Sequence, residues 1–409
     1  EEKGRDIPEG LEAAKLLVSY GYDALDTDVG TYDAWWWNHP PMYQEKGLFR
    51  PYCKMVKEVV DVPVLCAGRM DDPAMASEAV EDGTCDIVSL GRPLLADPDY
   101  VNKLRAGRTE DIRPCISCQE GCMGRVQEYS MINCAVNPQA ARERVTAYEP
   151  VRKSKKVMVV GGGVAGCEAA RVLAIRGHRP EVFEKTGCLG GNLIPGGAPD
   201  FKEDDLELAK WYETTLKKLD VPVHLHTEVR KEDVEKAGYD AVIIATGSVP
   251  KVFPLGDDAH VYTAAQVLTK EKDCGGSTVV VGGGLVGCET ALGKKVTIVE
   301  ALDKLMAVNG PLCHANKDML ERLIPYNGIE VVTGAKVTGF RDGMLSCVVQ
   351  EEKKEISCDS VILSVGYREE NSLYNDLQFD VPEIYLLGDA KKVSNIMYAI
   401  WDAFEVANH

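Results

Sequence analysis

The first 110 residues alternate between short apolar runs and segments whose apolar positions recur every three or four residues. The apolar runs end at glycine or polar residues and are expected to be buried strands, whereas the recurring pattern predicts amphipathic helices. The expected strands lie within residues 22–30, 62–70 and 85–98, and the expected helices within 7–21, 48–60 and 72–83. This alternation predicts three β/α units with a parallel sheet, whose ligands bind at the C-terminal strand ends.

Three β/α units are too few to close a barrel, and residue 1 falls at the entrance to a helix. We therefore expect that the chain lacks an N-terminal part of its first domain. Residues 1–110 are assigned to a partial barrel. Residues 111–150 are assigned to a cysteine-rich segment followed by a charged linker.

Two later segments share the order of apolar strand, glycine turn and helix. The first, at 155–173, contains GGGVAGCEAA, and the second, at 277–292, contains GGGLVGCETA. Such units are typical of dinucleotide-binding folds. The order of the remaining strands predicts two related folds, one inserted in the other. The outer fold takes residues 151–265 and 351–409, and the inner fold takes residues 266–350.

The helix after the second glycine turn is shorter than the helix after the first. Eight residues separate Glu168 from Gly177, whereas three separate Glu289 from Gly293. A helix that is more than one turn shorter is not expected to span a βαβ unit. The sequence therefore predicts that residues are missing from this crossover too, with a genuine deletion as the alternative.

The first glycine turn has the pattern G-x-G-x-x-G at Gly161, Gly163 and Gly166. Glycines here allow a tight turn and close approach of the backbone to a pyrophosphate at a helix N-terminus. Glu184 ends the next strand, where a carboxylate can accept hydrogen bonds from both ribose hydroxyls. A nucleotide site is expected, and a purely structural turn is the alternative.

Three further segments narrow the nucleotide of the outer fold to FAD. A glycine pair before asparagine resembles a second phosphate and ribose contact, and a late Gly-Asp pair resembles the motif that holds the ribityl chain. An Ala-Thr-Gly sequence resembles the segment that crosses between the folds. The residues concerned are Gly191, Asn192, Ala245, Thr246, Gly247, Gly388 and Asp389.

The second glycine turn repeats the pattern at Gly282, Gly284 and Gly287, and Glu300 ends the strand that follows. An acidic residue at this strand end repels a 2′-phosphate, so NADH rather than NADPH is expected. The alternative is a copy of the fold that has lost its ligand.

Between the two regions, four cysteines have the spacing C-x2-C-x3-C-x11-C, at Cys115, Cys118, Cys122 and Cys134. Thiolates at this density suit a soft metal or an iron–sulfur cluster. Zinc is the main alternative, but structural zinc sites commonly use two C-x2-C pairs and this segment has one. The spacing beside flavin motifs favours a [4Fe–4S] cluster over zinc and over scattered core cysteines.

Composition limits the classes of partner. The formal net charge is −18 over 409 residues, which argues against non-specific binding to nucleic acid or to anionic membranes. The sequence shows neither a signal-peptide pattern nor an apolar run of about 20 residues. The cysteines outside the motif are scattered through apolar segments, as expected for reduced thiols in a cytoplasmic protein.

Together these motifs resemble the iron–sulfur flavoenzymes of the old yellow enzyme class. That class includes 2,4-dienoyl-CoA reductases, 2-enoate reductases, trimethylamine dehydrogenase and bile-acid-inducible NADH:flavin oxidoreductases. The resemblance implies an α/β protein with the C-terminal part of a (β/α)8 TIM barrel, a [4Fe–4S] segment, and two nested Rossmann-like FAD- and NAD(P)-binding domains. It also implies FMN on the barrel, with electrons passing from NADH through FAD and the cluster to FMN.

Within the barrel, the resemblance assigns the FMN phosphate to two strand ends. Backbone amides and arginine side chains there would bind the dianion, and surface salt bridges are the alternative for the arginines. The residues are Ala67, Gly68, Arg69, Gly91 and Arg92.

The loop 31–43, TYDAWWWNHPPMY, corresponds to a region near the reacting double bond in dienoyl-CoA reductases. Tyr32 and His39 are candidate proton donors, and Trp35 to Trp37 are candidate walls of the pocket. A structural role is the alternative for His39. The family's usual catalytic tyrosine is expected in the missing N-terminal part.

The resemblance implies an NADH-dependent ene-reductase that acts on a C=C bond conjugated to a carbonyl. The substrate is expected to be a small enoate, an enone or a CoA thioester, and the protein is expected to form a homo-oligomer. The alternatives are the reverse desaturation, an amine dehydrogenase, and a subunit that passes electrons from NADH to a partner. Glu300 argues against the amine dehydrogenase, because trimethylamine dehydrogenase does not use NADH.

Overall fold

The computed structural model describes residues 4–308, 310 and 312–409. The chain divides into two compact units. Unit 1 comprises Glu1–Asn137 and Cys313–Met319, and unit 2 comprises Pro138–Leu312 and Leu320–His409. Within the described part of the chain, none of the helices has the length and apolar character that a membrane crossing requires.

Unit 1 is built on a parallel sheet of three strands in the order β1-β2-β3. Helices alternate with these strands, so the predicted β/α units are present. The strands are β1 Leu25–Thr27, β2 Val64–Cys66 and β3 Ile87–Val88. The helices are α1 Ile7–Ser19, α2 Trp35–Asn38, α3 Arg50–Lys57, α4 Pro73–Glu81, α5 Arg92–Ala96 and α6 Tyr100–Arg105.

Aspartate side chains begin two helices of this unit. The carboxylate of Asp6 accepts a hydrogen bond from Glu9 N at α1, and that of Asp72 accepts from Ala74 N and Met75 N at α4. Helix α3 packs on β2 and helix α4 packs on β3, and their buried faces share one apolar core. This core contains Leu48, Phe49, Cys53, Val64, Cys66, Met70, Ala79 and Cys85.

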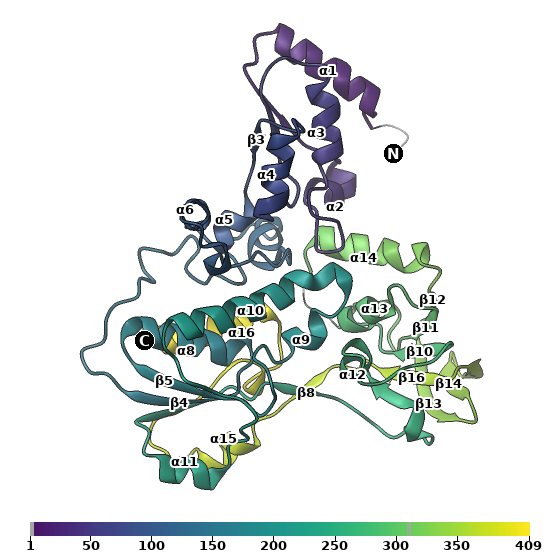
Figure 1. The fold of residues 1–409 in the computed structure, drawn as a ribbon. Coiled ribbons are helices and arrows are strands. Elements are labelled where there is room, and N and C mark those ends of the chain that lie inside the picture. Colours follow the sequence, from purple (N-terminus) through teal and green to yellow (C-terminus); the bar gives the residue numbers. More distant parts are fainter. Residues whose placement is uncertain (1–3, 309, 311) are drawn as a thin grey trace. The chain divides into compact units, whose positions relative to one another are not determined.

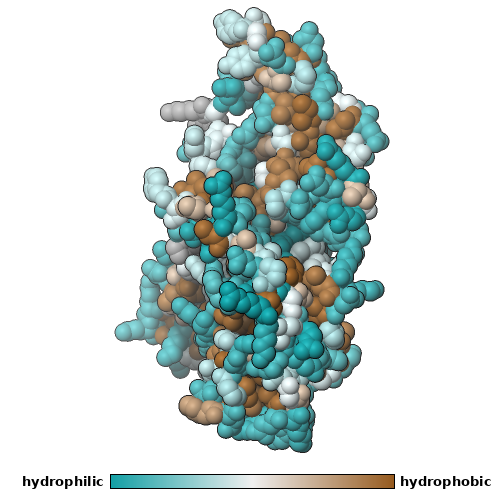
Figure 2. Space-filling view, turned by 90° about the vertical axis from the view of Figure 1, so that its left-hand side faces the viewer, coloured by the Kyte–Doolittle hydropathy of each residue, from teal (hydrophilic) through white to brown (hydrophobic). Residues whose placement is uncertain are grey.

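The cysteine-rich segment follows these units and has little regular structure. It contains a single π-helical turn at Glu120–Gly124 and the short helix α7 Arg125–Gln127. The predicted linker, residues 137–155, forms neither helix nor strand. Apolar and aromatic side chains are exposed in places on this segment and on α1; they include Leu16, Tyr20, Tyr129 and Met131. Figure 2 shows scattered areas of hydrophobic residues, in brown, on one face of the molecule.

The outer nucleotide fold of unit 2 has a parallel sheet in the order β18-β7-β4-β5-β6. Figure 1 shows α8, α10 and α16 on one side of this sheet and α11 and α15 on the other. The strands are β4 Lys156–Val160, β5 Arg179–Phe183, β6 Val223–His224, β7 Ala241–Ile244 and β18 Ile384–Leu386. The helices are α8 Val164–Arg176, α9 Leu193–Gly196, α10 Glu203–Lys218, α11 Lys231–Ala237, α15 Ser372–Leu377 and α16 Ile396–Asn408.

The inner fold has a second parallel sheet in the order β12-β11-β10-β16-β9 and an antiparallel sheet β13-β14-β15. The strands are β9 Val261–Thr263, β10 Thr278–Val281, β11 Val296–Val299, β12 Glu330–Val332, β13 Ala335–Arg341, β14 Met344–Val349, β15 Glu352–Ser357 and β16 Ser360–Leu363. The helices are α12 Ala264–Leu268, α13 Leu285–Ala291 and α14 His314–Tyr326. Strands β9 and β16 belong to the inner sheet, although both lie outside the segment 266–350 that was assigned to the inner fold.

The prediction that the second crossover is too short to span a βαβ unit is wrong. Strands β10 and β11 pair in parallel, with Thr278 opposite Val296 and Val281 opposite Val299. Helix α13 ends after seven residues, and Gly293 turns the chain back toward the sheet with φ +72°. A helix of about two turns is sufficient here, because it has to return the chain only to the start of a neighbouring four-residue strand.

Two strands carry the chain between the outer and inner folds. They are β8 Ser248–Pro250, on the way in, and β17 Tyr367–Glu369, on the way back. They pair in antiparallel fashion, with Ser248 opposite Glu369 and Pro250 opposite Tyr367. The inner fold is therefore inserted in the outer one through a two-stranded ribbon, as the nested order of motifs predicts.

Candidate functional site

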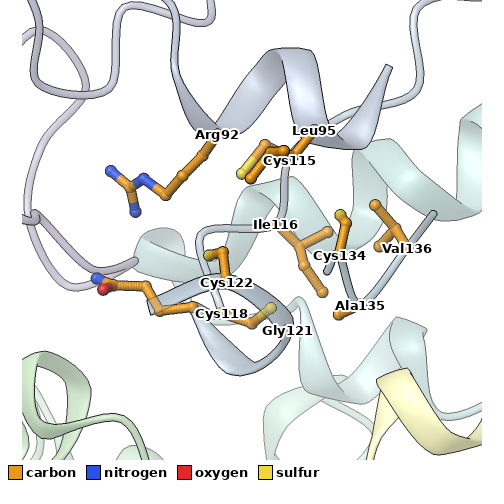
Figure 3. A pocket seen from close by; sticks show the side chains of 11 residues that line it. Arg92, Leu95, Cys115, Ile116, Cys118, Gly121, Cys122, Cys134, Ala135 and Val136 are labelled. Atoms are coloured by element: carbon orange, nitrogen blue, oxygen red, sulfur yellow. The ribbon is translucent and has the colours of Figure 1, made fainter. Parts of the chain in front are cut away.

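The four motif cysteines surround one pocket in unit 1 (Figure 3). The pocket encloses about 290 Å³ of space not filled by protein atoms, and Arg92 is the charged side chain that lines it. Ser117 and Gln119 flank Cys118 and both have left-handed backbone conformations, with φ +51° and +60°. These two residues bend the chain so tightly that Cys115, Cys118 and Cys122 reach the same cavity.

A glycine closes this loop against the fourth cysteine. A Cβ atom on Gly121 would lie 2.8 Å from Ala135 N and 2.9 Å from Cys134 Cα, so a larger residue would push the segment with Cys134 away. The glycine therefore holds the two parts of the motif together.

The donor set fits an iron–sulfur cluster better than a single metal ion. Four thiolates around one zinc ion lie about 3.8 Å apart, since Zn–S bonds are about 2.3 Å long and tetrahedral. Within the described part of the chain, no group of three or more Cys, His, Asp or Glu side chains is close enough to hold one ion. Thiolates that bind the corners of a cubane lie farther apart and leave a cavity between them, as found here.

The thiols also need a cationic centre to ionise. Burial raises the pKa of Cys118 well above the ordinary range and that of Cys134 to about 11. Neighbouring thiols raise both further, while Arg92 lowers the pKa of Cys115 and Cys122. Four thiolates in this pocket would need bound metal cations, whose positive charge compensates for burial and mutual repulsion.

The predicted FMN-phosphate residues follow β2 and β3, so both groups lie at C-terminal ends of adjacent strands. Gly68 has φ +85°, and a Cβ atom there would lie 2.7 Å from the ring of Phe49. Backbone hydrogen bonds join Leu48 N to Gly68 O and Gly47 N to Arg69 O. Ala67 continues directly from β2 into this turn.

The side chains of Arg69 and Arg92 both hold the loop that contains His39. Nη1 of Arg69 donates to the carbonyl oxygens of Met42 and Gln44. Nη1 of Arg92, the first residue of α5 after Gly91, donates to Pro40 O at 2.9 Å. Their role in phosphate binding stays a prediction.

The structure gives the two candidate proton donors different surroundings. The His39 ring packs against Trp35 with ring centres 4.9 Å apart and ring planes tilted by 33°, and within the described residues its buried Nδ1 has no hydrogen-bond partner. Burial and the neighbouring charge of Arg92 lower the pKa of His39 to about 4, so its imidazole is neutral at pH 7. Tyr32 is 84% exposed and its ring meets the edge of Trp35.

In unit 2 the first glycine turn forms a tight cradle at the start of α8. A Cβ atom on Gly166 would lie 1.9 Å from Gly161 O, and one on Gly161 would lie 2.3 Å from Ala245 O. Glu184 supports the turn, since its Oε2 accepts from Gly162 N at 2.7 Å and its Oε1 accepts from Thr186 N at 2.7 Å. The free amides at the start of α8 suit a pyrophosphate.

Two of the other predicted FAD residues are joined by a hydrogen-bonded chain through a serine. Asn192 Nδ2 donates to Ser248 Oγ at 3.2 Å, and Ser248 Oγ donates to Asp389 Oδ2 at 2.8 Å. Burial raises the pKa of Asp389. Ser248 directly follows the Ala245-Thr246-Gly247 segment but was not predicted; its place beside that motif is the available signal.

Glycines fix the shape of the remaining FAD segments. Gly191 has φ +54°, and its neighbour Gly190 forms a β-bridge with Gly163 of the first turn. Gly247 has φ +73° and Gly388 has φ +58°, and a Cβ atom on Gly388 would lie 2.8 Å from Ala165 Cβ. These segments therefore approach the first glycine turn closely.

The second glycine turn has the same close backbone approach and the same glutamate-to-amide hydrogen bonds as the first. A Cβ atom on Gly287 would lie 1.9 Å from Gly282 O, and Gly284 caps the start of α13. Glu300 Oε2 accepts from Gly283 N, and its Oε1 accepts from Leu302 N at 2.7 Å. Glu300 thus holds the same position in the inner fold as Glu184 in the outer fold.

A buried ion pair joins the two folds and was not predicted. Lys202 Nζ lies 3.0 Å from Glu289 Oε2 on α13 and 3.7 Å from Asp205 Oδ2 on α10. The first turn has Glu168 at the position equivalent to Glu289, and Arg171 pairs with it three residues later at 2.7 Å. The second turn has Leu292 in place of that arginine. This difference between the repeats was the available signal.

Comparisons with known proteins agree with this division. Residues 155–403 match the model of the family described as pyridine nucleotide-disulphide oxidoreductase. Residues 2–111 match the NADH:flavin oxidoreductase / NADH oxidase family. Because the first match spans more than half of its residues, the chain belongs to the pyridine nucleotide-disulphide oxidoreductase family. The predicted relation to iron–sulfur flavoenzymes of the old yellow enzyme class, and the predicted fold class, are confirmed.

Individual relatives are longer than this chain. Cinnamate reductase of Clostridium sporogenes is 51% identical over 414 residues, which cover 100% of this chain and 62% of that protein. Bilirubin reductase of Mediterraneibacter gnavus is 33% identical and covers 99% of this chain and 64% of its own length. A structure of 2-naphthoyl-CoA reductase with 2-naphthoyl-CoA superposes with a TM-score of 0.92 at 27% identity, covering 100% of this chain and 63% of that one. The chain thus spans somewhat less than two thirds of these relatives.

The family membership bears out the predicted cofactors, which are FMN, FAD, NADH and a [4Fe–4S] cluster. The assignment of individual residues to these cofactors rests on the geometry given above. Unit 1 brings together the cysteines, Arg92 and the loop with His39, and unit 2 brings together the FAD and NADH motifs.

Proposed function

We propose that the protein reduces a C=C bond conjugated to a carbonyl group, with NADH as reductant and an aryl enoate as substrate. One observation carries this proposal. In unit 1, a loop that packs a neutral His39 against Trp35 is anchored by Arg92, a side chain that also lines the cysteine pocket. An aromatic surface, a polar ring atom without a described partner, and an electron-transfer site are thereby joined in one unit.

The overall reaction converts enoate, NADH and one proton to the saturated acid and NAD⁺. Bound flavins supply hydride chemistry and the bound cluster supplies one-electron transfer. The chain's own residues bind and orient the reactants. Trp35 offers a ring for stacking, and the imidazole of His39 donates a hydrogen bond to the substrate carbonyl, which polarises the double bond.

The low pKa of His39 shapes this assignment. A histidine with a pKa of about 4 carries a proton on both nitrogens in about one molecule in a thousand at pH 7. We therefore assign His39 to carbonyl polarisation, and Tyr32 stays the candidate for proton delivery to the α-carbon.

The choice of an aryl enoate draws on the aromatic loop and on two relatives. The relative with 51% identity is named for cinnamate, which is itself an aryl enoate. The structure with a TM-score of 0.92 contains a naphthoyl thioester, which is also an aromatic acid derivative. Three consecutive tryptophans from Trp35 give this chain a larger aromatic surface than a short aliphatic enoate requires.

In unit 2, we assign the first glycine turn, Glu184 and the Asn192–Ser248–Asp389 chain to FAD. The second glycine turn and Glu300 are assigned to NADH. Support comes from the matched geometry of the two turns, in which each glutamate bonds the backbone amide inside the turn. A cytoplasmic location and a homo-oligomer stay predictions.

The test is anaerobic NADH oxidation by the iron-loaded, flavin-loaded protein with three acceptors: cinnamate, crotonate and cyclohexenone. We expect stoichiometric reduction of cinnamate, with kcat/KM at least about tenfold above that for crotonate, because stacking on Trp35 adds binding energy in the aromatic case. Equal rates for cinnamate and crotonate would remove the aryl preference. Reduction of FAD without turnover of any acceptor would favour an electron-transfer subunit instead.

Variants of the loop locate the chemistry. His39→Gln is expected to lower cinnamate reduction about tenfold or more while FAD reduction by NADH stays near that of the wild type. Tyr32→Phe is expected to lower the same step if its hydroxyl delivers the proton. A matched control is Tyr20→Phe, since Tyr20 is also exposed, at 73%, but lies on α1. An effect of Tyr20→Phe equal to that of Tyr32→Phe would contradict the role of Tyr32.

A further inference from the structure

We propose that Gln119 is a positioning residue that sets the place of His39 by tying its backbone to the cysteine segment. The inference rests on the proposed function for its consequence in catalysis. The physical tie itself is a property of unit 1 that can be measured separately.

Gln119 lies at a buried junction of three chain segments. Its side chain is 1% exposed, and it directly follows the cluster residue Cys118. Nε2 of Gln119 donates to His39 O at 2.7 Å, and the thiol of Cys313 donates to Gln119 Oε1 at 3.6 Å. The partners lie 80 residues before and 194 residues after it in the sequence.

The orientation of this amide follows from its partners. A backbone carbonyl oxygen can only accept a hydrogen bond, so the NH2 group of Gln119 must face His39. The thiol of Cys313 then supplies the donor for the remaining oxygen. No other assignment of the two amide ends satisfies both contacts.

The backbone of Gln119 is specialised for this role. Its φ of +60° is a left-handed conformation that side chains larger than glycine adopt rarely. Gly124 N donates to Gln119 O at 2.8 Å and fixes the following π-helical turn at Glu120–Gly124. A left-handed backbone together with a side-chain amide that is hydrogen-bonded at both ends indicates that the surrounding structure determines the position of the amide.

The tie acts on a part of the loop that has little other regular support. His39 ends the four-residue helix α2, and Pro40 follows with no amide hydrogen to donate. Gln119 holds the His39 carbonyl, and Arg92 holds the next one, that of Pro40. The two side chains that hold the carbonyl groups of His39 and Pro40 also line the cysteine pocket, and this fixes the backbone from which the imidazole projects.

The test compares three variants of the full protein loaded with iron and flavins. Gln119→Met keeps the length of the side chain but removes both polar atoms. Cys313→Ala removes the thiol partner alone. Gln127→Met is the matched control, because the Gln127 side chain in the same segment accepts from His314 N at 3.1 Å and does not touch the loop.

The primary readout is hydrogen–deuterium exchange of residues 35–43. We expect exchange to rise about tenfold or more in Gln119→Met and to stay near the wild-type level in Cys313→Ala and Gln127→Met. Iron content and FAD reduction by NADH are expected to stay unchanged in all three. In Gln119→Met, kcat/KM for cinnamate is expected to fall about tenfold.

Two results would overturn the proposal. One is exchange in residues 35–43 that is the same in Gln119→Met as in Gln127→Met. The other is loss of iron from Gln119→Met in proportion to any change in the loop, since the amide would then serve the cluster segment rather than His39. If the wild-type protein does not reduce cinnamate, the proposed function fails, and the exchange measurement still decides whether the tie exists.

Discussion

At the scale of single residues, the environment of a side chain changes its chemistry beyond what its type indicates. His39 is a possible acid by type, yet burial beside Arg92 lowers its pKa to about 4 and leaves it neutral. The sequence predicted that this histidine lies on a loop with three tryptophans. It did not predict the charge state, because Arg92 is 53 positions away and approaches only in the folded unit.

The first prediction concerns the pH dependence of stability. An unfolded chain protonates His39 near pH 6.5, whereas the folded unit resists protonation down to about pH 4. Folded stability should therefore fall as the pH drops through this window, because the unfolded state binds the proton more tightly. Between pH 7 and pH 5, His39→Gln should lose about 1 kcal/mol less than the wild type, after allowance for solvent screening.

Thermal or denaturant unfolding of unit 1, followed by tryptophan fluorescence at pH 7 and pH 5, measures this difference. His178→Gln in unit 2 serves as the control, because the pKa of His178 is also lowered by burial but that residue is remote in sequence from the loop. Parallel loss of stability in the wild type and in His39→Gln would contradict the prediction.

The second prediction concerns the choice of nucleotide. Both carboxylate oxygens of Glu300 accept backbone hydrogen bonds, from Gly283 and Leu302. Glu300→Gln removes the charge that would repel a 2′-phosphate and retains one acceptor, so the ratio of kcat/KM for NADH over NADPH should fall about tenfold. Glu184→Gln, its counterpart in the outer fold, should leave this ratio unchanged. Equal use of both nucleotides by the wild type would contradict the role of Glu300.

At the scale of elements, the sequence motif and the helix that follows it can vary independently. In both turns, a Cβ atom on the third glycine of the motif would lie 1.9 Å from the carbonyl oxygen of the first glycine. Their helices nevertheless differ, with 13 residues in α8 and seven in α13. The motif was predictable because sterics at the turn permit only glycine. The short crossover was misjudged, because the length a crossover needs depends on the strands it joins.

The third prediction separates the two turns. Gly287→Ala places a methyl group against Gly282 O and should weaken NADH binding about a hundredfold or more while FAD is retained. Gly166→Ala makes the same clash in the outer fold and should release FAD instead. Flavin content by absorbance and NADH affinity from anaerobic flavin reduction distinguish the two variants. Loss of FAD from Gly287→Ala would contradict this assignment of the turns.

At the scale of the whole molecule, the order of motifs along the chain predicted the nesting of the two folds and the cysteine segment before them. The contacts that link distant segments were not predictable. Lys202 reaches Glu289 because the inner fold lacks the arginine that neutralises Glu168 in the outer fold. The two partners lie 87 residues apart in the sequence, so no local sequence pattern predicts the pair.

The fourth prediction follows from the separation of the cofactor motifs between the two units. Cys134→Ser should remove or weaken the cluster, lower the iron content from about four per chain, and abolish NADH-driven enoate reduction. Reduction of FAD by NADH should continue, because the residues assigned to both lie in unit 2. Cys188→Ser, at an exposed cysteine outside the motif, is the control. Zinc in place of iron in the anaerobically purified wild type would contradict the cluster assignment.

The paired strands β8 and β17 have a consequence for motion within unit 2. The two chain crossings are hydrogen-bonded side by side, so sliding one strand past the other would break the pairing of Ser248 with Glu369. Ser248 belongs both to this ribbon and to the hydrogen-bonded chain that ends at Asp389. A displacement of the inner fold at the ribbon would therefore disturb Ser248 and, through it, the geometry of Asn192 and Asp389, the two residues that we assign to FAD.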